Sequence, residues 1–263
     1  MKSDPIARMK GIFVGRYRAF VRWVCAYFMR KRGFKVIHFL HIGKTGGTAL
    51  GRVFRGNQRV GKYWFVLHEH STTVKRLPKN DPFTFVLRDP VDRFVSAFYS
   101  RYRQGKPAYF IPWTAAEANA FALFPTANSL AEALSDSDPE CCQNARAAMQ
   151  AIGHVRTHYS DWLGSIDNLT ALSSRIPLVG WQPELDSYLA GLVVFLEGDA
   201  QAYCFPKNAK QSHKGSHGGR GELSELAIQN LQKWYCEDIR CVELIRHLGL
   251  FSPRAPVGSD NEY

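Results

Sequence analysis

A glycine-containing turn between a predicted strand and a predicted helix restricts the fold of this chain more than any other feature. Residues 36–42 (VIHFLHI) are apolar and β-branched, which predicts a buried strand. The motif from His41 to Thr48 ends in KTGGT, and helical spacing of apolar residues continues over 48–55. Glycines let a backbone approach an anion, the first N–H groups of a helix point at it, and Lys44 adds a positive charge. We therefore expect a phosphate-type anion site here.

Two other interpretations of this turn stay open on the motif alone. An ATP-binding P-loop has the pattern GxxxxGK[ST], whereas Lys44 precedes the glycine pair, so the segment does not match that rule. A plain turn with a surface lysine would have the same composition.

A second motif, RDPVDRFVS at residues 88–96, favours the anion site. It follows the apolar run 83–87 (FTFVL), which predicts another buried strand. Asp89 suits an N-cap and proline the first turn of a helix over residues 91–103. Ligands of parallel α/β sheets bind at the carboxyl ends of the strands, so Arg88 and Ser96 can converge on one phosphate.

Arg93, in the same motif, has two possible roles. It could be a third phosphate contact, but an ion pair with Asp89 or Asp92 is favoured, because these carboxylates are its neighbours in the sequence.

The order of elements predicts the fold class. A third apolar run, residues 63–67, reads as a strand between the other two, and strands alternate with helices over the first hundred residues. We expect an α/β fold: a single domain with a central parallel sheet flanked by helices and a P-loop-like strand-loop-helix nucleotide site. Residues 106–174 are predicted to be mostly helical, with breaks near Pro125 and Pro139.

The C-terminal third is predicted to contain a polar loop and a helix. Residues 208–221 (NAKQSHKGSHGGRG) are polar and glycine-rich, and residues 223–248 have one long helical pattern. We divide the chain into a basic N-terminal arm (1–35), a main domain (36–252) and a short tail (253–263).

The charge of the chain belongs mainly to its N-terminal arm. Residues 1–35 hold ten Lys or Arg against one acid, a net +9 of the total +11. The remaining 228 residues are nearly neutral, which argues against a nucleic-acid partner. Apolar residues at helical spacing from Ile6 to Phe28, with Arg8, Arg18 and Arg22 opposite, predict an amphipathic helix.

Such a helix could lie through residues 5–30 on an anionic membrane surface, or pack on its own domain or a second subunit of a homodimer. The sequence contains no run of about 18 apolar residues, so we expect no transmembrane helix. We expect a cytoplasmic protein, open to peripheral membrane contact, whose six cysteines are free thiols.

The two motifs together resemble a known family. A KTGGT loop after a strand, followed by FVxRDPxxRxxS, resembles the sulfotransferases that use 3′-phosphoadenosine 5′-phosphosulfate (PAPS) and release the bisphosphate PAP. The likeness is to the carbohydrate branch, which includes heparan sulfate 2-O-sulfotransferases and bacterial enzymes, and it is strongest over residues 36–104. The resemblance implies that Arg88 and Ser96 hold the 3′-phosphate. It implies that the 5′-phosphosulfate is held by Lys44, Thr45, Gly46, Gly47 and Thr48.

Weaker likeness extends to other segments. The loop containing Ser212 and Lys214 is similar to a family loop that closes over the donor, although an exposed loop with incidental lysines stays open. The helix after it carries Tyr235 and Asp238. Residues 105–175 match the family poorly and are where we expect acceptor specificity.

A histidine cluster supplies the candidate base. His68-Glu69-His70 follows the strand at 63–67, and neutral histidine suits proton abstraction from a hydroxyl. Related enzymes carry a histidine here, and the His-Ser-Thr context favours His70, with His68 or Glu69 as alternatives. His41 is expected to be a structural residue.

The predicted reaction is sulfuryl transfer from PAPS to a hydroxyl of an acceptor. A carbohydrate, either a polysaccharide or a glycolipid, is favoured, and a small hydroxylated metabolite stays open. His70 would take the proton, while Lys44, the loop N–H groups and the Thr45 or Thr48 hydroxyls neutralise the leaving phosphate. No metal is expected. Two alternatives are an ATP-dependent phosphotransferase, which would need Mg²⁺ ligands, and a non-catalytic nucleotide-binding, membrane-associated protein.

Overall fold

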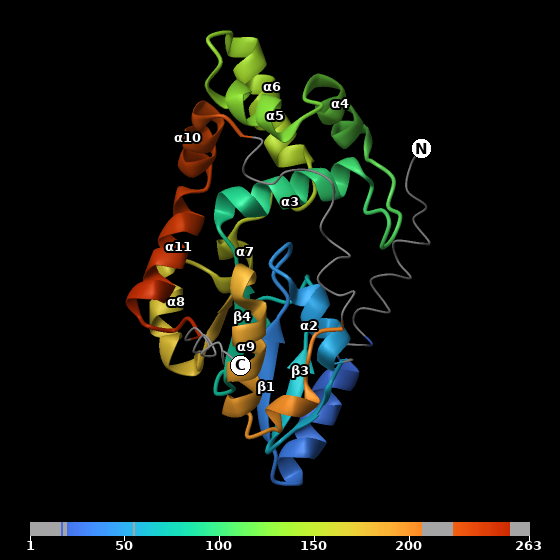
Figure 1. Ribbon diagram of the computed structural model, residues 1–263, viewed down its shortest axis with the longest axis vertical. Helices are drawn as coiled ribbons and strands as arrows, with labels where there is room; N and C mark the ends of the chain where they lie inside the picture. The colour runs from blue at the N-terminus through green and yellow to red at the C-terminus, as the bar shows by residue number, and fades with distance from the viewer. Residues whose placement is uncertain (1–16, 18–19, 55, 207–222, 253–263) are drawn as a thin grey trace, which may run out of the picture.

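A five-stranded sheet in the order β2-β3-β1-β4-β5 forms the centre of the computed structural model, which describes residues 17, 20–54, 56–206 and 223–252 (Figure 1). The strands are β1 (Lys35–Leu40), β2 (Gln58–Val60), β3 (Tyr63–Leu67), β4 (Phe83–Leu87) and β5 (Val179–Trp181). All neighbouring strands pair in parallel except β2, which pairs antiparallel with β3 at the edge. The predicted single α/β domain with a largely parallel sheet is confirmed.

The strands differ from the predicted ones mainly at their ends. β3 and β4 have the predicted bounds, but β1 ends at Leu40, because the N–H of Ile42 donates to the carbonyl of Leu40 (3.1 Å) and starts the turn. β2 and β5 were not predicted, since three residues are too few to produce a periodic pattern.

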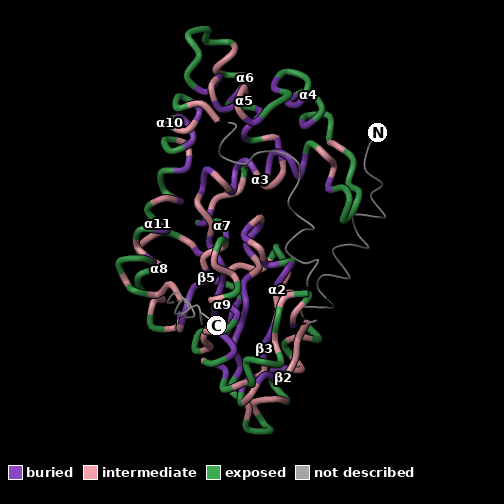
Figure 2. Tube along the Cα trace, viewed as in Figure 1, coloured by how far each residue is buried: buried purple, intermediate pink, exposed green. Residues whose placement is uncertain are grey.

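Helices cover both faces of the sheet. On one face, α2 (Gly47–Phe54) and α9 (Leu185–Phe195) bury Leu50 and Tyr188 in the same apolar cluster as Phe39 of β1. On the other, α7 (Tyr159–Leu163), α8 (Ile166–Ala171) and α11 (Cys236–His247) contribute to a second cluster with Phe85 of β4. Figure 2 shows the buried strands running between these layers.

A helical extension lies beyond the carboxyl ends of the strands (Figure 1). It consists of α3 (Pro90–Tyr102), α4 (Ala115–Leu123), α5 (Ala127–Glu132), α6 (Pro139–Ala151) and α10 (Glu225–Trp234). These helices share a third apolar cluster. Asp89 caps α3 as predicted, because its carboxylate accepts from the N–H groups of Val91 and Asp92.

The long helix predicted over residues 223–248 is wrong in one respect: it is two helices, α10 and α11, divided at Tyr235. The Tyr235 side chain is fully buried and its hydroxyl donates to the carbonyl of Val155 (2.7 Å), while its backbone leaves helical geometry. A buried anchor of this kind is not visible in helical periodicity.

The N-terminal arm includes a helix, described for Tyr17 and residues 20–31. Ala26 of this helix packs in a small apolar cluster with Val36 of β1 and Val66 of β3. Within the described residues, none of the helices combines the length and apolar character needed to cross a lipid bilayer. All six cysteines are free thiols, as expected.

Candidate functional site

The turn between β1 and α2 has an unusual backbone. Lys44 has a φ of 68° and Gly46 a φ of 97°, both in the left-handed region that non-glycine residues rarely adopt. Such a conformation costs free energy for a lysine and persists where the surroundings enforce it, often at functional sites. The backbone therefore presents Lys44 in a fixed, strained position between strand and helix.

Glycine is required in this turn for steric reasons. A Cβ at Gly47 would lie 2.1 Å from the ring of His41, and one at Gly46 would lie 2.7 Å from the Leu185 side chain. The backbone of the turn therefore passes in close contact between His41, which follows β1, and Leu185 at the start of α9. The first N–H groups of α2 have no acceptor within the helix, and Gly46 and Gly47 have no side chains that could cover them.

The two threonines of the turn differ. Thr45 is 1% exposed, and its hydroxyl donates to the carbonyl of Ile42 (3.0 Å), so that its hydrogen is used within the protein. Thr48 is exposed in the first turn of α2. Of the two hydroxyls, only that of Thr48 has the exposure to meet a ligand.

Positive charges gather around Lys44. Burial, together with the nearby guanidinium groups of Arg88 and Arg103, lowers the pKa of Lys44 to about 8. Mutual repulsion of three cations is relieved by a bound polyanion. The turn is thus electrostatically suited to a phosphate or sulfate ester.

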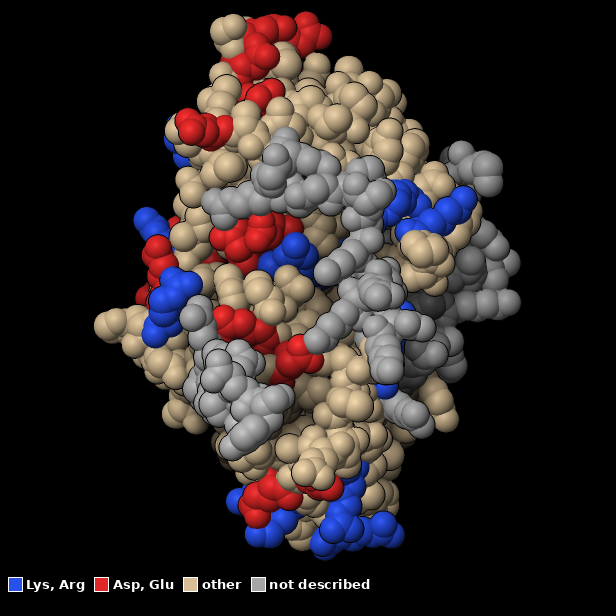
Figure 3. All heavy atoms as spheres, viewed as in Figure 1, with Lys and Arg blue, Asp and Glu red and all other residues tan. Residues whose placement is uncertain are grey.

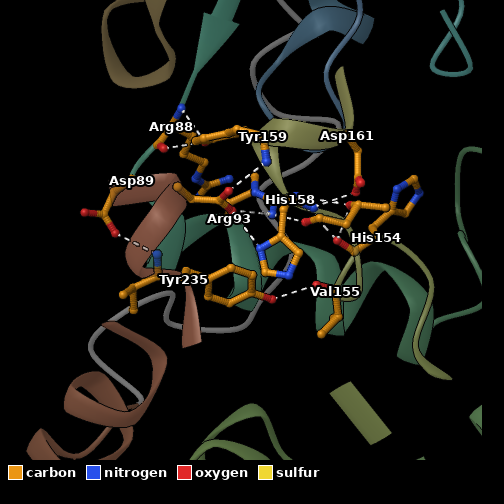
Figure 4. Close-up of polar contacts among 12 residues, drawn as sticks. Arg88, Asp89, Arg93, His154, Val155, His158, Tyr159, Asp161 and Tyr235 are labelled. Carbon is orange, nitrogen blue, oxygen red and sulfur yellow. Dashed lines mark hydrogen bonds and ion pairs between the residues drawn. The ribbon is translucent and has the colours of Figure 1, made fainter. Parts of the chain in front are cut away.

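Hydrogen bonds fix the backbone of Arg88, whereas the Nε of its side chain has no hydrogen-bond partner among the described residues. The buried hydroxyl of Tyr159 donates to the Arg88 carbonyl (2.5 Å) and accepts from the Arg88 N–H (3.1 Å) (Figure 4). The Nε of Arg88 is buried and has no hydrogen-bond partner among the described residues. A buried guanidinium donor without a partner is expensive unless a ligand satisfies it, and an anion would do so. Ser96 lies two turns into α3 and is half-buried.

His70 is oriented by two hydrogen bonds. Its Nδ1 lies 3.0 Å from the carbonyl oxygen of His41, and a carbonyl can only accept, so Nδ1 carries the proton. The Nε2 of neutral His70 is then the basic atom. The indole of Trp162 donates to the His70 carbonyl (2.7 Å) and holds the backbone.

The pKa of His70 lies below the ordinary histidine value. Desolvation is the largest cause; the hydrogen bond to the His41 carbonyl raises the pKa by less, and Lys44 lowers it and Glu69 raises it by smaller amounts. Neutral imidazole therefore dominates near pH 7.

The rings of two more histidines lie near the ring of His70. The His41 ring lies 3.8 Å from it, centroid to centroid, and the His154 ring 6.0 Å. Burial lowers the pKa of His41 to about 3 and that of His154 to about 4, with Lys44 the next cause at His154. His154 has a φ of 64°, a second strained residue bordering the turn. Both rings are neutral near pH 7.

A cavity of about 470 Å³ opens beside these histidines. It lies between the N-terminal helix and the carboxyl end of β3. Its apolar lining includes Tyr17, Val21 and Leu67, and its polar lining includes His41, Asn57 and His70.

Comparison with known proteins identifies the family. A model of the sulfotransferase family matches residues 27–170, which is more than half of the 263 residues. The chain belongs to the sulfotransferase family. Neither the curated proteins nor the solved structures gave a match. The matched range extends through residue 170 and so includes most of residues 105–175, where acceptor specificity is expected.

Family membership supports a transferase that moves a sulfuryl group to an acceptor substrate. Within this sulfotransferase, the alternatives to His70 already have partners. The Nε2 of His68 lies 2.8 Å from Nδ1 of His38, whose Nε2 in turn lies 2.8 Å from the Asp81 carboxylate. Glu69 accepts from Arg22 (2.7 Å). The geometry therefore favours His70 over both.

The ion pair found for Arg93 is with Asp238 of α11 (3.3 Å), not with the neighbouring aspartates that were favoured from the sequence. Arg93 is fully buried between the rings of Tyr159 and Tyr235, and its guanidinium donates to the carbonyl of Thr157 (Figure 4). Asp238 also accepts from the N–H of Tyr159 (2.7 Å). Arg93 therefore joins α3, α7 and α11 beneath the site.

Two predicted residues, Ser212 and Lys214, lie outside the described residues. The structure adds His154 and Arg103 to the neighbourhood of Lys44. Neither residue belongs to a recognised motif, so the sequence offered no signal for them beyond their being a histidine and an arginine. Within the described part of the chain, no group of three or more His, Cys, Asp or Glu could hold a metal ion.

Proposed function

We propose that this sulfotransferase moves the sulfuryl group from PAPS to a hydroxyl of a carbohydrate acceptor. The observation that carries the proposal is the convergence of a strained, cation-rich turn at Lys44 with a neutral histidine whose basic Nε2 is set by the His41 carbonyl. Sulfuryl transfer needs both features: charge for the leaving phosphate and a base for the hydroxyl proton.

The residues fit the donor as follows. Lys44, the backbone N–H groups of Thr45, Gly46 and Gly47, and the Thr48 hydroxyl would hold the 5′-phosphosulfate. The unpartnered Nε of Arg88 supports a 3′-phosphate contact, and Ser96 is its second proposed partner. The buried bond from Thr45 to Ile42 changes the earlier expectation, because the Thr45 hydroxyl shapes the turn and its backbone N–H remains for the ligand.

In the proposed reaction, Nε2 of His70 takes the hydroxyl proton while the acceptor oxygen bonds to sulfur. The bond from sulfur to the bridging phosphate oxygen breaks, and PAP leaves with the added negative charge. Lys44, whose backbone is held at a φ of 68° in the turn, would stabilise the charge that develops on that oxygen.

The cavity beside His70 is the proposed acceptor site. Three apolar side chains and six polar or charged ones line it, which suits a sugar with its hydroxyl groups and apolar ring face, and its volume lies in the range of small-molecule sites. A polysaccharide end and a glycolipid headgroup both fit this chemistry.

Two experiments test the proposal. Thermal shift should be larger with PAP than with ATP or with adenosine 5′-phosphate, because only PAP has both phosphate groups in the required positions. Incubation with sulfur-labelled PAPS and a panel of polysaccharides and glycolipids should give a labelled product without added Mg²⁺. A larger shift with ATP, or activity that depends on Mg²⁺ and ATP, would favour phosphotransfer instead.

A further inference from the structure

The N-terminal helix faces the domain with its arginines. Arg22 donates to Glu69 (2.7 Å) and Arg30 pairs with Asp81, while the small Ala26 between them is buried. The inner face of this helix therefore combines two ion pairs with smaller apolar side chains, among them the half-buried Val24 and Met29. The aromatic side chains of the helix do not pack on the core, unlike those of the usual amphipathic surface helix.

The outer face of the same helix is aromatic. Exposed fractions are 62% for Phe20, 59% for Trp23, 45% for Tyr27 and 58% for Phe28. Trp23 and Tyr27 stack with ring centroids 6.1 Å apart, and Tyr27 contacts Phe28 edge-on. Contiguous exposed aromatics of this size mark an interaction surface, because leaving them in water is costly.

Basic side chains border the aromatic face. Lys31 lies over the Tyr27 ring (5.7 Å), and Lys31 and Arg32 are exposed at the end of the helix. Figure 3 shows Lys and Arg gathered, with a few acidic side chains, at the lower end of the molecule, where this helix turns into β1.

We infer that the outer face of the N-terminal helix binds an anionic lipid surface. Tryptophan and tyrosine are the side chains that favour the headgroup region, and flanking lysine and arginine are attracted to anionic lipids. Residues 1–35 carry a net charge of +9, and an excess of basic side chains remains for a negative surface after Arg22 and Arg30 pair with the domain. A second copy of the chain is disfavoured as the occupant, because two such arms repel each other.

The lipid-binding face adjoins the proposed acceptor cavity. Tyr17 and Val21 are exposed on the helix and also line the cavity beside His70. Lipid binding therefore brings the mouth of the cavity to molecules held at the surface. This consequence rests on the proposed function, whereas binding of the helix to lipid does not.

The test is flotation of the full chain with vesicles of phosphatidylcholine alone or mixed with phosphatidylglycerol. The double variant Trp23→Ser/Tyr27→Ser removes two outward rings. The matched control Val194→Ser/Leu226→Ser removes two apolar side chains of similar exposure on α9 and α10. Thermal shift with PAP is measured on all three proteins, which checks folding and donor binding separately.

Wild type and control should float with the phosphatidylglycerol vesicles and not with pure phosphatidylcholine, and the double variant should bind at least tenfold more weakly. Equal flotation of all three proteins, or no preference for anionic vesicles, would overturn the inference. So would sedimentation that shows a dimer dissociated by the double variant without vesicle binding. Flotation without any PAP shift would count against the proposed function alone.

Discussion

His70 donates from Nδ1 to the backbone carbonyl of His41, 3.0 Å away, and the two rings lie 3.8 Å apart. This contact joins the strand that enters the turn to the segment that leaves β3. Because the acceptor is a carbonyl, it sets the tautomer of His70 regardless of pH above its pKa. The proposed base is thus oriented by the same strand that positions Lys44.

The pH profile of turnover should have an acid limb due to His70. Its pKa lies below 6.5, so the neutral base is fully present above that value and is lost as pH falls through the pKa. Turnover should decline on the acid side, and His70→Ala should reduce it by about 100-fold or more and remove that limb. The measurement is initial rate between pH 5 and 9.

Unchanged turnover of His70→Ala across this range would assign the base to another residue. His247→Ala is the control, because His247 is an exposed histidine at the end of α11.

Lys44→Met should have opposite effects on activity and stability. Loss of the charge should reduce turnover on the order of 100-fold to 1,000-fold. Below about pH 8 the folded protein confines a charged Lys44 among other cations, and this penalty is relieved only as pH rises above 8. Without nucleotide at pH 7, Lys44→Met should therefore raise the melting temperature.

Lys79→Met, at an exposed position, should leave both quantities unchanged. A Lys44→Met protein that keeps full PAPS-dependent activity would falsify the proposed role of Lys44.

Arg88 should decide whether the 3′-phosphate is recognised. Wild type should bind PAP more tightly than adenosine 5′-phosphate, and Arg88→Met should abolish most of that preference, because the guanidinium, whose Nε has no hydrogen-bond partner among the described residues, is the proposed contact. Ser96→Ala should weaken the binding of PAP by about tenfold. Calorimetric titration with both nucleotides measures the preference, with exposed Arg246→Met as control. An Arg88→Met variant that still discriminates would place the 3′-phosphate elsewhere.

Glu117 should position His154 and stabilise the fold. Its carboxylate accepts from Arg101 (2.7 Å) and from the N–H of Gly153 (3.1 Å), the residue before strained His154. Burial alone would raise the pKa of Glu117, but hydrogen bonds from Arg101 and the backbone lower it to about 2. Its stabilisation is present above the ordinary glutamate value, near 4.5, and is lost as pH falls from there toward 2.

Glu117→Gln should accordingly cost on the order of 3 kcal/mol at pH 7 and flatten the acid dependence of stability in that window. Urea unfolding at several pH values tests this, with exposed Glu243→Gln as control. If the unfolding free energy is unchanged, the buried pair with Arg101 contributes nothing net.

Some features of this protein follow from local sequence. The bounds of β3 and β4, the Asp89 cap of α3 and the turn at Lys44 all depend on residues within one short segment. Apolar periodicity, a capping carboxylate and a glycine pair act locally, so their pattern is readable before the chain is folded.

Other features depend on side chains far apart in the chain. The division at Tyr235 is anchored by Val155, 80 residues away, and Arg93 bypasses its neighbouring aspartates for Asp238, 145 residues away. Local charge spacing suggested the wrong partner, because burial between two tyrosine rings decides where a desolvated guanidinium must find its carboxylate.

The sequence by itself indicated the family, the largely parallel sheet and the strand-turn-helix segment at Lys44. Only the tertiary structure brought His154 and Arg103 to Lys44, fixed the tautomer of His70 and turned the aromatic face of the N-terminal helix outward. The physical reason is the range of the interactions: turns and caps are made between near neighbours, whereas burial, charge clustering and exposure are properties of the packed chain.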